Sequence, residues 1–300
     1  MIYITDNMGQ MCNRILLFAH CIAFGIENKQ DVKHVCFDDL KAYFEELDQN
    51  ISGVQINVSK KSSCRNFIIK KTNSLKRHMG MLSTSYNVKY TRNLDSLTQK
   101  MEKSNFSVIG NWYFRNYKLL WKHRSSIIDY FKIDERITEP INQLVFKYKT
   151  QYKIVVGVHM RRGDYRTWNL GKFYFSDEDY KKWIQNFLDE VKGSPKNVLF
   201  ILFSNEKIDL KMSKDISIVI SHGNQVEDLY LLSKCDYIMG PPSSYSWWAA
   251  FSGGTKYRVL YNHKIDLKLV DFIDFSQNYI PEFSSVNKEV LDKYFTEIFD

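Results

Sequence analysis

The chain has 300 residues, of which 44% are hydrophobic and 25% are charged, and its formal net charge is +8. These proportions are those of a globular protein that folds throughout, so they exclude a disordered chain. The length allows two domains of ordinary size, and we place them at residues 1–150 and 151–300.

The chain opens with a predicted strand, a glycine turn and a helix. The strand is Ile2–Ile4, the turn contains Gly9, and apolar side chains then recur at the spacing of one helix face. These positions are Ile15, Ala19, Ile22, Ala23 and Ile26. Such a turn presents free backbone amides at a helix N-terminus, where a phosphate or the polar edge of a sugar can bind. An ordinary strand-to-helix connection is the alternative, and for a lone glycine it is the favoured one.

The rest of the first domain has a mixed pattern. We predict strands at 35–37, 54–58 and 107–110, a helix at 119–131, and another helix that begins at 139–140. This combination indicates an α/β domain.

The second domain alternates strands and helices more regularly. An almost unbroken apolar run ends at His159, as expected for a strand covered on both faces of a parallel sheet. The later elements are a helix capped by Ser176, strands at 198–203 and 216–220, a helix at 226–235, strands at 237–239 and 259–261, and a last helix at 288–299. This alternation predicts a parallel sheet of Rossmann type, and we expect the last helix to pack back on the first domain.

The cysteines and the N-terminus indicate a cytoplasmic protein. The five cysteines are scattered, without Cys-x-x-Cys or zinc-ligand spacing, so we expect reduced thiols and no structural metal. The N-terminus lacks the basic and apolar regions of a signal peptide. Apolar runs such as 198–203 are too short to span a membrane.

A basic tract at 60–92 carries much of the excess positive charge and contains no carboxylate. Such a tract is either solvated or faces the phosphates of a partner such as RNA or an anionic membrane. The chain lacks a recognisable RNA-binding motif, so nucleic acid is the less favoured partner. We expect the tract to allow peripheral contact with the inner face of the membrane.

Polar side chains gather where three strands of the second domain end. They are His159, Arg161, Arg162 and Asp164, then Ser204 and Asn205, then Ser243, Ser244 and Ser246. Parallel strands present their carboxyl ends on one edge of a sheet, so we expect these clusters to converge. The planar fork of arginine suits a phosphate, which predicts a nucleotide-diphosphate site. The alternatives are that Arg161 simply pairs with Asp164 and that the serines only cap helices.

Asp228 lies in the first turn of the helix that precedes the serine cluster. On the residues alone, stabilisation of the helix dipole, alone or with Glu227, is its favoured role. A carboxylate at this edge could instead accept the N1 and N2 protons of a guanine. The nearby Trp247 and Trp248 are expected to form core and pocket wall.

Several of these segments together resemble a known family. The run 158–165 resembles the His-x-Arg-Arg-x-Asp motif of the α-1,2-fucosyltransferases and of the wider group that includes α-1,6- and O-fucosyltransferases. Residues 229–238 followed by 243–250 are similar to the stretch of the α-1,2 enzymes from Met-Ser-x-Cys to Asn-Ser-Ser-Phe-Ser-Trp-Trp. The turn at 8–14 is similar to their glycine-rich start. The chain departs from the family pattern at Cys12, Glu206, Asp209 and Pro242.

The resemblance implies a GT-B-like enzyme, with two Rossmann-like domains facing a cleft. It implies that residues 151–300 bind GDP-β-L-fucose and that residues 1–150 form the acceptor side. Carried over by position, Arg161 would contact the β-phosphate and help GDP to depart, while Arg162 and Asp164 would order the loop. The remaining donor-binding positions would be His159 and Asp228 at the nucleoside, Ser244 at a phosphate oxygen, and Ser204, Asn205, Ser243, Ser246, Gly9 and Asn13.

The implied reaction is an inverting, metal-independent transfer of fucose to a glycan hydroxyl, expected to be O2 of a galactose in an oligosaccharide or polysaccharide repeat unit. Fixed cations and amides can stabilise the charge of the departing diphosphate, so no metal is required. The alternatives are another GDP-sugar or a non-galactose acceptor, and, less favoured, a basic nucleic-acid or lipid-binding module.

Attack by the acceptor hydroxyl is helped by a general base, which we expect in the first domain. The candidates are His20, His34, Asp6, Asp38 and Asp39. Asp38 and Asp39 look like a metal-binding pair, but adjacent side chains point to different sides, so a solvated turn is expected there.

Overall fold

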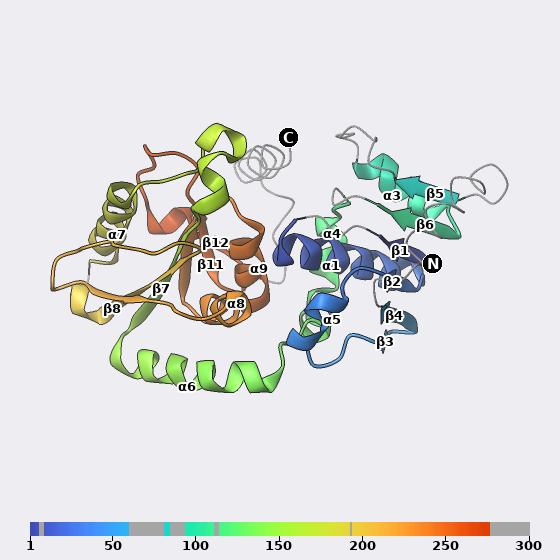
Figure 1. Cartoon of the computed structure of the whole chain (residues 1–300), viewed down its shortest axis with the longest axis horizontal. Helices are drawn as coiled ribbons and strands as arrows, with labels where there is room; N and C mark the ends of the chain where they lie inside the picture. The colour runs from blue at the N-terminus through green and yellow to red at the C-terminus, as the bar shows by residue number, and fades with distance from the viewer. Residues whose placement is uncertain (6–8, 60–80, 85–93, 111–113, 193, 277–300) are drawn as a thin grey trace. The chain divides into compact units, whose positions relative to one another are not determined.

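The structure, a computed structural model, describes residues 1–5, 9–59, 81–84, 94–110, 114–192 and 194–276 (Figure 1). The chain divides into two compact units, Met1–Glu135 and Arg136–Asp300, and each contains a six-stranded sheet together with helices. This arrangement confirms the predicted α/β class. The predicted last helix at 288–299 and the basic side chains of the 60–92 tract lie outside the described residues.

The boundary between the units falls after the first residue of helix α6 (Glu135–Gln151), whereas the sequence predicts it at residue 150. The contacts of α6 explain the difference. Lys149 Nζ lies 2.9 Å from Asp236 Oδ1, and the Tyr230 hydroxyl donates to Asn142 Oδ1 at 2.9 Å. Because these partners belong to the second sheet and its helices, α6 is counted with the second unit.

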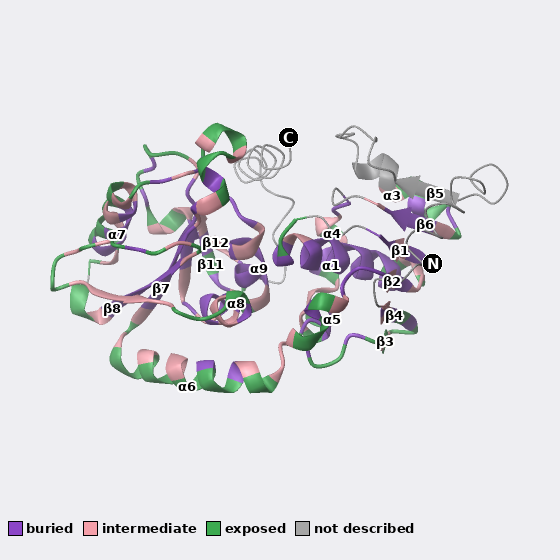
Figure 2. Ribbon diagram, in the orientation of Figure 1, coloured by how far each residue is buried: buried purple, intermediate pink, exposed green. Residues whose placement is uncertain are grey.

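The first sheet has the strand order β3-β4-β2-β1-β6-β5, and its neighbours are parallel except for β3 and β4. Its strands are β1 (Ile2–Ile4), β2 (Val32–His34), β3 (Gln49–Ile51), β4 (Val54–Val58), β5 (Met81–Thr84) and β6 (Phe106–Ile109). Its helices are α1 (Met11–Asn28), α3 (Leu94–Glu102), α4 (Tyr117–Lys122) and α5 (Arg124–Tyr130). Helix α1 is buried along most of its length (Figure 2), which agrees with apolar residues on nearly all its faces.

Two predicted elements of the first unit differ from the structure. The strand predicted at 35–37 is displaced, since β2 ends at His34. Arg14 Nη2 donates to the Cys36 carbonyl at 2.5 Å, and the chain then turns into a 3-10 helix at Asp38–Tyr43. The helix predicted at 119–131 is two helices, α4 and α5, that meet at His123.

The second sheet has the order β12-β11-β10-β7-β8-β9, and all its neighbours are parallel except β11 and β12. Its strands are β7 (Ile154–Met160), β8 (Val198–Ser204), β9 (Ser217–Ile220), β10 (Tyr237–Gly240), β11 (Lys256–Val259) and β12 (Ile273–Asp274). Its further helices are α7 (Asp177–Val191), α8 (Gln225–Ser233) and α9 (Ser244–Gly253). The predicted parallel Rossmann-type sheet is therefore confirmed, with one short antiparallel strand added at its edge.

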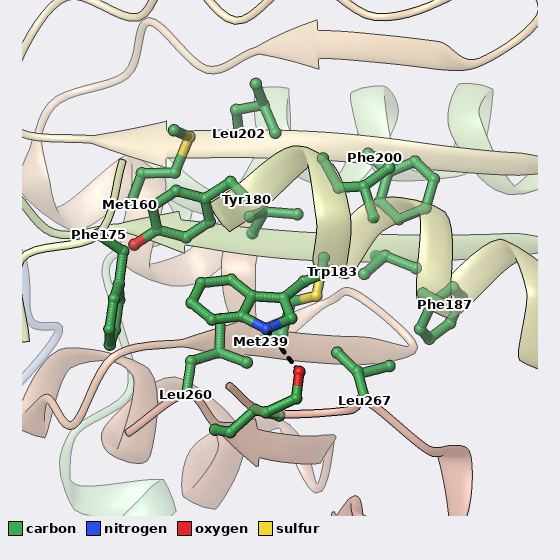
Figure 3. Close-up of a cluster of buried hydrophobic side chains, with 14 of the residues drawn as sticks. Met160, Phe175, Tyr180, Trp183, Phe187, Phe200, Leu202, Met239, Leu260 and Leu267 are labelled. Atoms are coloured by element: carbon green, nitrogen blue, oxygen red, sulfur yellow. Dashed lines mark hydrogen bonds between the residues drawn. The ribbon is translucent and has the colours of Figure 1, made fainter. Parts of the chain in front are cut away.

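Helix α7 covers the central strands with a cluster of buried side chains (Figure 3). Trp183 is fully buried in it, and its indole Nε1 donates to the Ile265 carbonyl at 3.2 Å. The rings of Phe175 and Tyr180 lie 5.0 and 5.4 Å from Trp183, both edge-on. Aromatic burial of this kind supplies much of the free energy that holds a helix on a sheet.

The start of α7 agrees with the sequence. Ser176 Oγ accepts from the Asp179 backbone N–H at 3.2 Å, and Asp179 Oδ2 accepts from the Ser176 N–H at 2.8 Å, which is a capping box.

Within the ranges that the structure describes, no helix combines the length and the hydropathy needed to cross a bilayer.

Candidate active site

Four parallel strands of the second unit end side by side, in the order β10-β7-β8-β9. The loops that leave their carboxyl ends meet along one edge of the sheet, called here the carboxyl edge. The pairing of Met160 with Ser204 shows that the ends of β7 and β8 are level. All three polar clusters predicted from the sequence lie on this edge, and hydrogen bonds join one loop to the next.

His159 is buried, and its Nδ1 lies 2.6 Å from Ser246 Oγ in helix α9. Burial, with a smaller contribution from the Arg161 charge, lowers the pKa of His159 to about 3, so the ring is neutral. The ring of Tyr245 lies 5.1 Å from it. At Gly240 a Cβ atom would lie 2.8 Å from the His159 carbonyl oxygen, so strand β10 approaches this closely only because the residue is glycine.

Arg161 and Asp164 form an ion pair, which is the alternative to a binding role that the sequence leaves open. Arg161 Nη2 donates to Asp164 Oδ2 at 2.9 Å, and the guanidinium lies 5.7 Å above the Tyr165 ring. The Arg161 side chain is 15% exposed and that of Asp164 is 50% exposed. A guanidinium has five N–H donors, so a bond from one of them to Asp164 orients the fork and leaves capacity for an anion.

The Arg162 side chain pairs with a different carboxylate. Its Nη2 donates to Asp177 Oδ1 in the first turn of α7, and its backbone N–H donates to Asn205 Oδ1 at 2.9 Å. The side chain is only 9% exposed. The two neighbouring arginines therefore have different surroundings, and of these two Arg161 is the one with a partly exposed fork.

The residues after β8 bond to the chain that leaves β7. Ser204 Oγ donates to the Met160 carbonyl at 2.9 Å, and Asn205 Oδ1 accepts the Arg162 amide. Both side chains are predicted from the sequence to contact the donor sugar nucleotide. In the structure these polar atoms contact the backbone of the arginine loop.

The serine cluster begins helix α9. Ser243 caps it, with Oγ accepting from the Tyr245 backbone N–H at 3.2 Å, and Ser244 is the first helical residue. Free amides at such an N-terminus favour an anion. The Tyr165 hydroxyl donates to the Pro242 carbonyl, which ties this turn to the arginine loop.

Asp228 lies in the first turn of α8, as predicted, but Asn224 provides the cap of that helix. Asp228 Oδ1 accepts from Ser221 Oγ at 2.5 Å. Burial raises the pKa of Asp228, and the Ser221 hydrogen bond opposes this shift. The carboxylate is therefore held in a fixed orientation at the end of β9, on the same edge as the arginine loop.

Gly9 and Asn13 lie in the first unit, at the start of α1. Gly9 has φ +79°, and a Cβ atom there would lie 2.7 Å from Asn13 Nδ2, so this turn needs glycine. Gln10, with an extended backbone, occupies the N-cap position of the helix.

The histidines proposed as the general base are buried in the first unit. His20 Nδ1 accepts from the Asn116 N–H at 3.0 Å, and His34 Nδ1 accepts from the Cys36 N–H at 3.2 Å. Burial is the main cause that lowers both pKa values, that of His34 to about 3. A solvent-exposed base is therefore not found at either histidine.

Asp39 is 61% exposed, as expected for a solvated turn at 38–39, and it is also ion-paired. Arg14 donates to its two carboxylate oxygens at 2.5 and 2.7 Å. The Arg14 hydrogen bonds hold the pKa of Asp39 below its usual value, which makes it a weaker base. Asp6 lies outside the described residues, and Asp38 is half-buried.

Three groups at the carboxyl edge were not predicted as site residues: the Tyr165 hydroxyl, the Asp177 carboxylate and the Glu206 carboxylate. Glu206 Oε1 accepts from the Gly163 N–H at 3.1 Å. Glu206 could have been found from its position directly after Ser204 and Asn205, whereas the partners of Tyr165 and Asp177 depend on the folded loops.

Within the part of the chain that the structure describes, no group of three or more His, Cys, Asp or Glu side chains could hold a metal ion.

Comparisons with known proteins agree with this arrangement. The model of glycosyl transferase family 11 matches residues 56–282. The O-antigen biosynthesis glycosyltransferase WbnK of Escherichia coli is 28% identical over 152 residues, which are 46% of this chain and 48% of WbnK. The match thus spans about half the length of this curated relative.

Two solved structures share the fold at low sequence identity. A variant of Arabidopsis thaliana FUT1 in complex with GDP is 12% identical, with a TM-score of 0.60 over 91% of this chain and 74% of that one. The α-1,6-fucosyltransferase NodZ, an enzyme known from Bradyrhizobium, soaked with GDP-fucose, is 14% identical, with a TM-score of 0.54 over 91% and 98% of the two chains.

Proposed function

Because the chain belongs to glycosyl transferase family 11, we propose that it transfers L-fucose from GDP-β-L-fucose to a hydroxyl group of a glycan. The observation that carries this proposal is the partly exposed Arg161 fork, fixed by Asp164 on the same edge as the start of α9 and Asp228. These groups fit a ligand that carries both a diphosphate and a guanine.

In the proposed reaction the acceptor oxygen bonds to C1 of fucose while the bond from C1 to the β-phosphate oxygen breaks. The acceptor proton passes to a base, the electron pair leaves with GDP, and the configuration at C1 inverts. Arg161 stabilises the charge that grows on the β-phosphate, together with the amides at the start of α9 and Ser244. Fixed donors of this kind need no metal, so the reaction is proposed to be metal-independent.

We infer that the acceptor is a galactose-containing oligosaccharide or polysaccharide repeat unit, with O2 of galactose as the attacking group. The family resemblance of residues 229–250 to the α-1,2 enzymes supports the linkage, and the O-antigen assignment of WbnK supports a polysaccharide. NodZ is an α-1,6 enzyme with the same fold, so regiochemistry has to be tested directly.

The test is incubation with GDP-fucose and a panel of β-galactosides in EDTA, with release of GDP as the readout. We expect release to depend on a galactoside and to persist in EDTA. Calorimetry with GDP, UDP and CDP should show binding of GDP alone. The proposal would be contradicted if the protein neither binds GDP nor releases it from GDP-fucose. Release with non-galactose glycans alone would favour the alternative acceptor.

Asp228 is proposed to accept the N1 and N2 protons of the guanine, so Asp228→Asn should weaken GDP binding about 10- to 100-fold, the effect of a lost charged hydrogen bond. Only the ionised carboxylate accepts both protons. Wild-type affinity should therefore fall as the pH drops through the raised pKa of Asp228, while the variant shows no such change. Calorimetry at several pH values measures both effects.

Glu227→Gln is the matched control, because Glu227 lies in the same turn and accepts from the Asn224 N–H at 2.8 Å. Its GDP affinity should equal that of the wild type. Equal affinities of the Asp228→Asn variant and the wild type would remove Asp228 from guanine recognition.

A further inference from the structure

Three consecutive side chains at the end of β8 hydrogen-bond to the backbone at the end of β7 and in the loop that follows it. Ser204 Oγ donates to the Met160 carbonyl at 2.9 Å. Asn205 Oδ1 accepts from the Arg162 N–H at 2.9 Å. Glu206 Oε1 accepts from the Gly163 N–H at 3.1 Å. These bonds fix the backbone immediately before and after Arg161.

Glu206 also closes the far end of this loop. Its Oε2 accepts from Arg166 Nη2 at 2.8 Å, and its own backbone N–H donates to Ser204 Oγ at 3.2 Å. One carboxylate therefore joins Gly163 and Arg166, the first and last residues of the 3-10 turn that carries Asp164. The Glu206 side chain is 32% exposed and that of Arg166 is 55% exposed.

The contact between the two loops is tight at Gly163. This residue has φ +44°, and a Cβ atom there would lie 2.5 Å from Asn205 Nδ2. Such a backbone conformation is costly for other residues. Because residue 163 is glycine, the loop takes this conformation at little cost and leaves room for the Asn205 side chain to pack directly against it.

We propose that Ser204, Asn205 and Glu206 are positioning residues that hold the arginine loop so that the Arg161 fork points to the departing diphosphate, with Glu206 as the main anchor. This inference rests on the proposed function. A charge that stabilises a transition state is effective only when it is fixed in advance, because reorientation during the reaction costs free energy. Asp164 fixes the Arg161 side chain, and the 204–206 segment fixes the backbone beneath it.

Glu206→Ala is the direct test. It removes the acceptor of the Gly163 N–H, so kcat should fall about 10- to 100-fold, the size of effect that a small misplacement of a catalytic group produces. The KM for GDP-fucose should change much less, since Arg161, Asp228 and α9 still contact the donor. Glu206→Gln keeps an acceptor for Gly163 and should restore most of kcat. Lys207→Ala, which removes the exposed neighbouring side chain, should behave like the wild type.

Hydrogen exchange of a peptide that covers residues 160–166 provides a readout that needs no substrate. Exchange should be faster in Glu206→Ala than in the wild type and should return toward wild type in Glu206→Gln. Unchanged exchange or an unchanged kcat in Glu206→Ala would overturn the positioning role. An equal loss of kcat in both variants, with faster exchange in Glu206→Ala alone, would overturn it too, because the rate would then not follow the order of the loop.

The two proposals can fail separately. If the wild-type protein neither binds GDP nor uses GDP-fucose, the proposed function fails, and the exchange experiment still decides whether Glu206 holds the loop. If the wild type is active and Glu206→Ala matches it, the positioning role fails and the proposed function stands.

Discussion

Replacement of Arg161 with alanine should lower kcat about 10²- to 10³-fold, the usual cost of removing one fixed donor that stabilises developing charge. The fork of Arg161 is oriented by Asp164 at 2.9 Å and is partly exposed at the carboxyl edge, directly after β7. Its neighbour Arg162 donates to Asp177 and cannot take its place without breaking a partly buried ion pair.

Steady-state release of GDP from GDP-fucose measures this effect, and the fold is checked by the melting temperature, which should change by no more than about 2 °C. Arg161→Lys should recover only part of the rate, because a lysine offers a point charge in place of a planar fork. Lys207→Ala removes an exposed positive charge from the neighbouring loop and should leave the rate unchanged. A kcat for Arg161→Ala close to that of the wild type would show that Arg161 does not stabilise the leaving group.

Replacement of Trp183 with alanine should lower the free energy of unfolding of the second unit by about 3–5 kcal/mol, the range found for large aromatic residues in cores. The indole is fully buried among α7 and the central strands (Figure 3), and its Nε1 bonds to the Ile265 carbonyl. The variant loses the contacts with Phe175 and Tyr180, leaves a cavity, and leaves that carbonyl without its donor.

Urea unfolding followed by far-UV circular dichroism measures the loss as a shift of the transition midpoint. Leu170→Ala is the matched control, because Leu170 is also a large apolar residue but is 99% exposed. Its effect should stay within about 0.5 kcal/mol, as for other exposed positions. If Trp183→Ala unfolds at the same urea concentration as the control, the cluster under α7 is not the main core of the unit.

The elements predicted best are those whose sequence pattern has one structural meaning. The apolar runs that end at His159 and Phe203 are strands β7 and β8, and the Ser176 cap begins α7 one residue later. The predicted strand at 259–261 is displaced, because β11 covers Lys256–Val259. Helix α9 was not predicted, because its residues are apolar on most faces and lack an amphipathic period.

The family resemblance seen in the sequence is confirmed by the match of glycosyl transferase family 11 to residues 56–282. Its motifs were visible because they are short runs in which chemically distinctive residues are adjacent, such as 158–165. The motifs do not give the roles of these residues. A motif specifies residue types, whereas the neighbours of each residue depend on the folded chain.

The sequence by itself determined the α/β class, the parallel sheet of the second unit and the gathering of three polar clusters on one sheet edge. These follow from hydrophobic periodicity and from the geometry of parallel strands, which are properties of the local chain. Only the tertiary structure decided which partner each polar atom has. Arg161 and Arg162 are adjacent in sequence, yet Arg161 bonds to Asp164 and Arg162 pairs with Asp177. Glu206 and Gly163 are far apart in sequence, and they meet because β7 and β8 are neighbours in register. Hydrogen bonds between residues far apart in sequence depend on atomic positions that the packing of whole elements sets, so no local pattern could have assigned them.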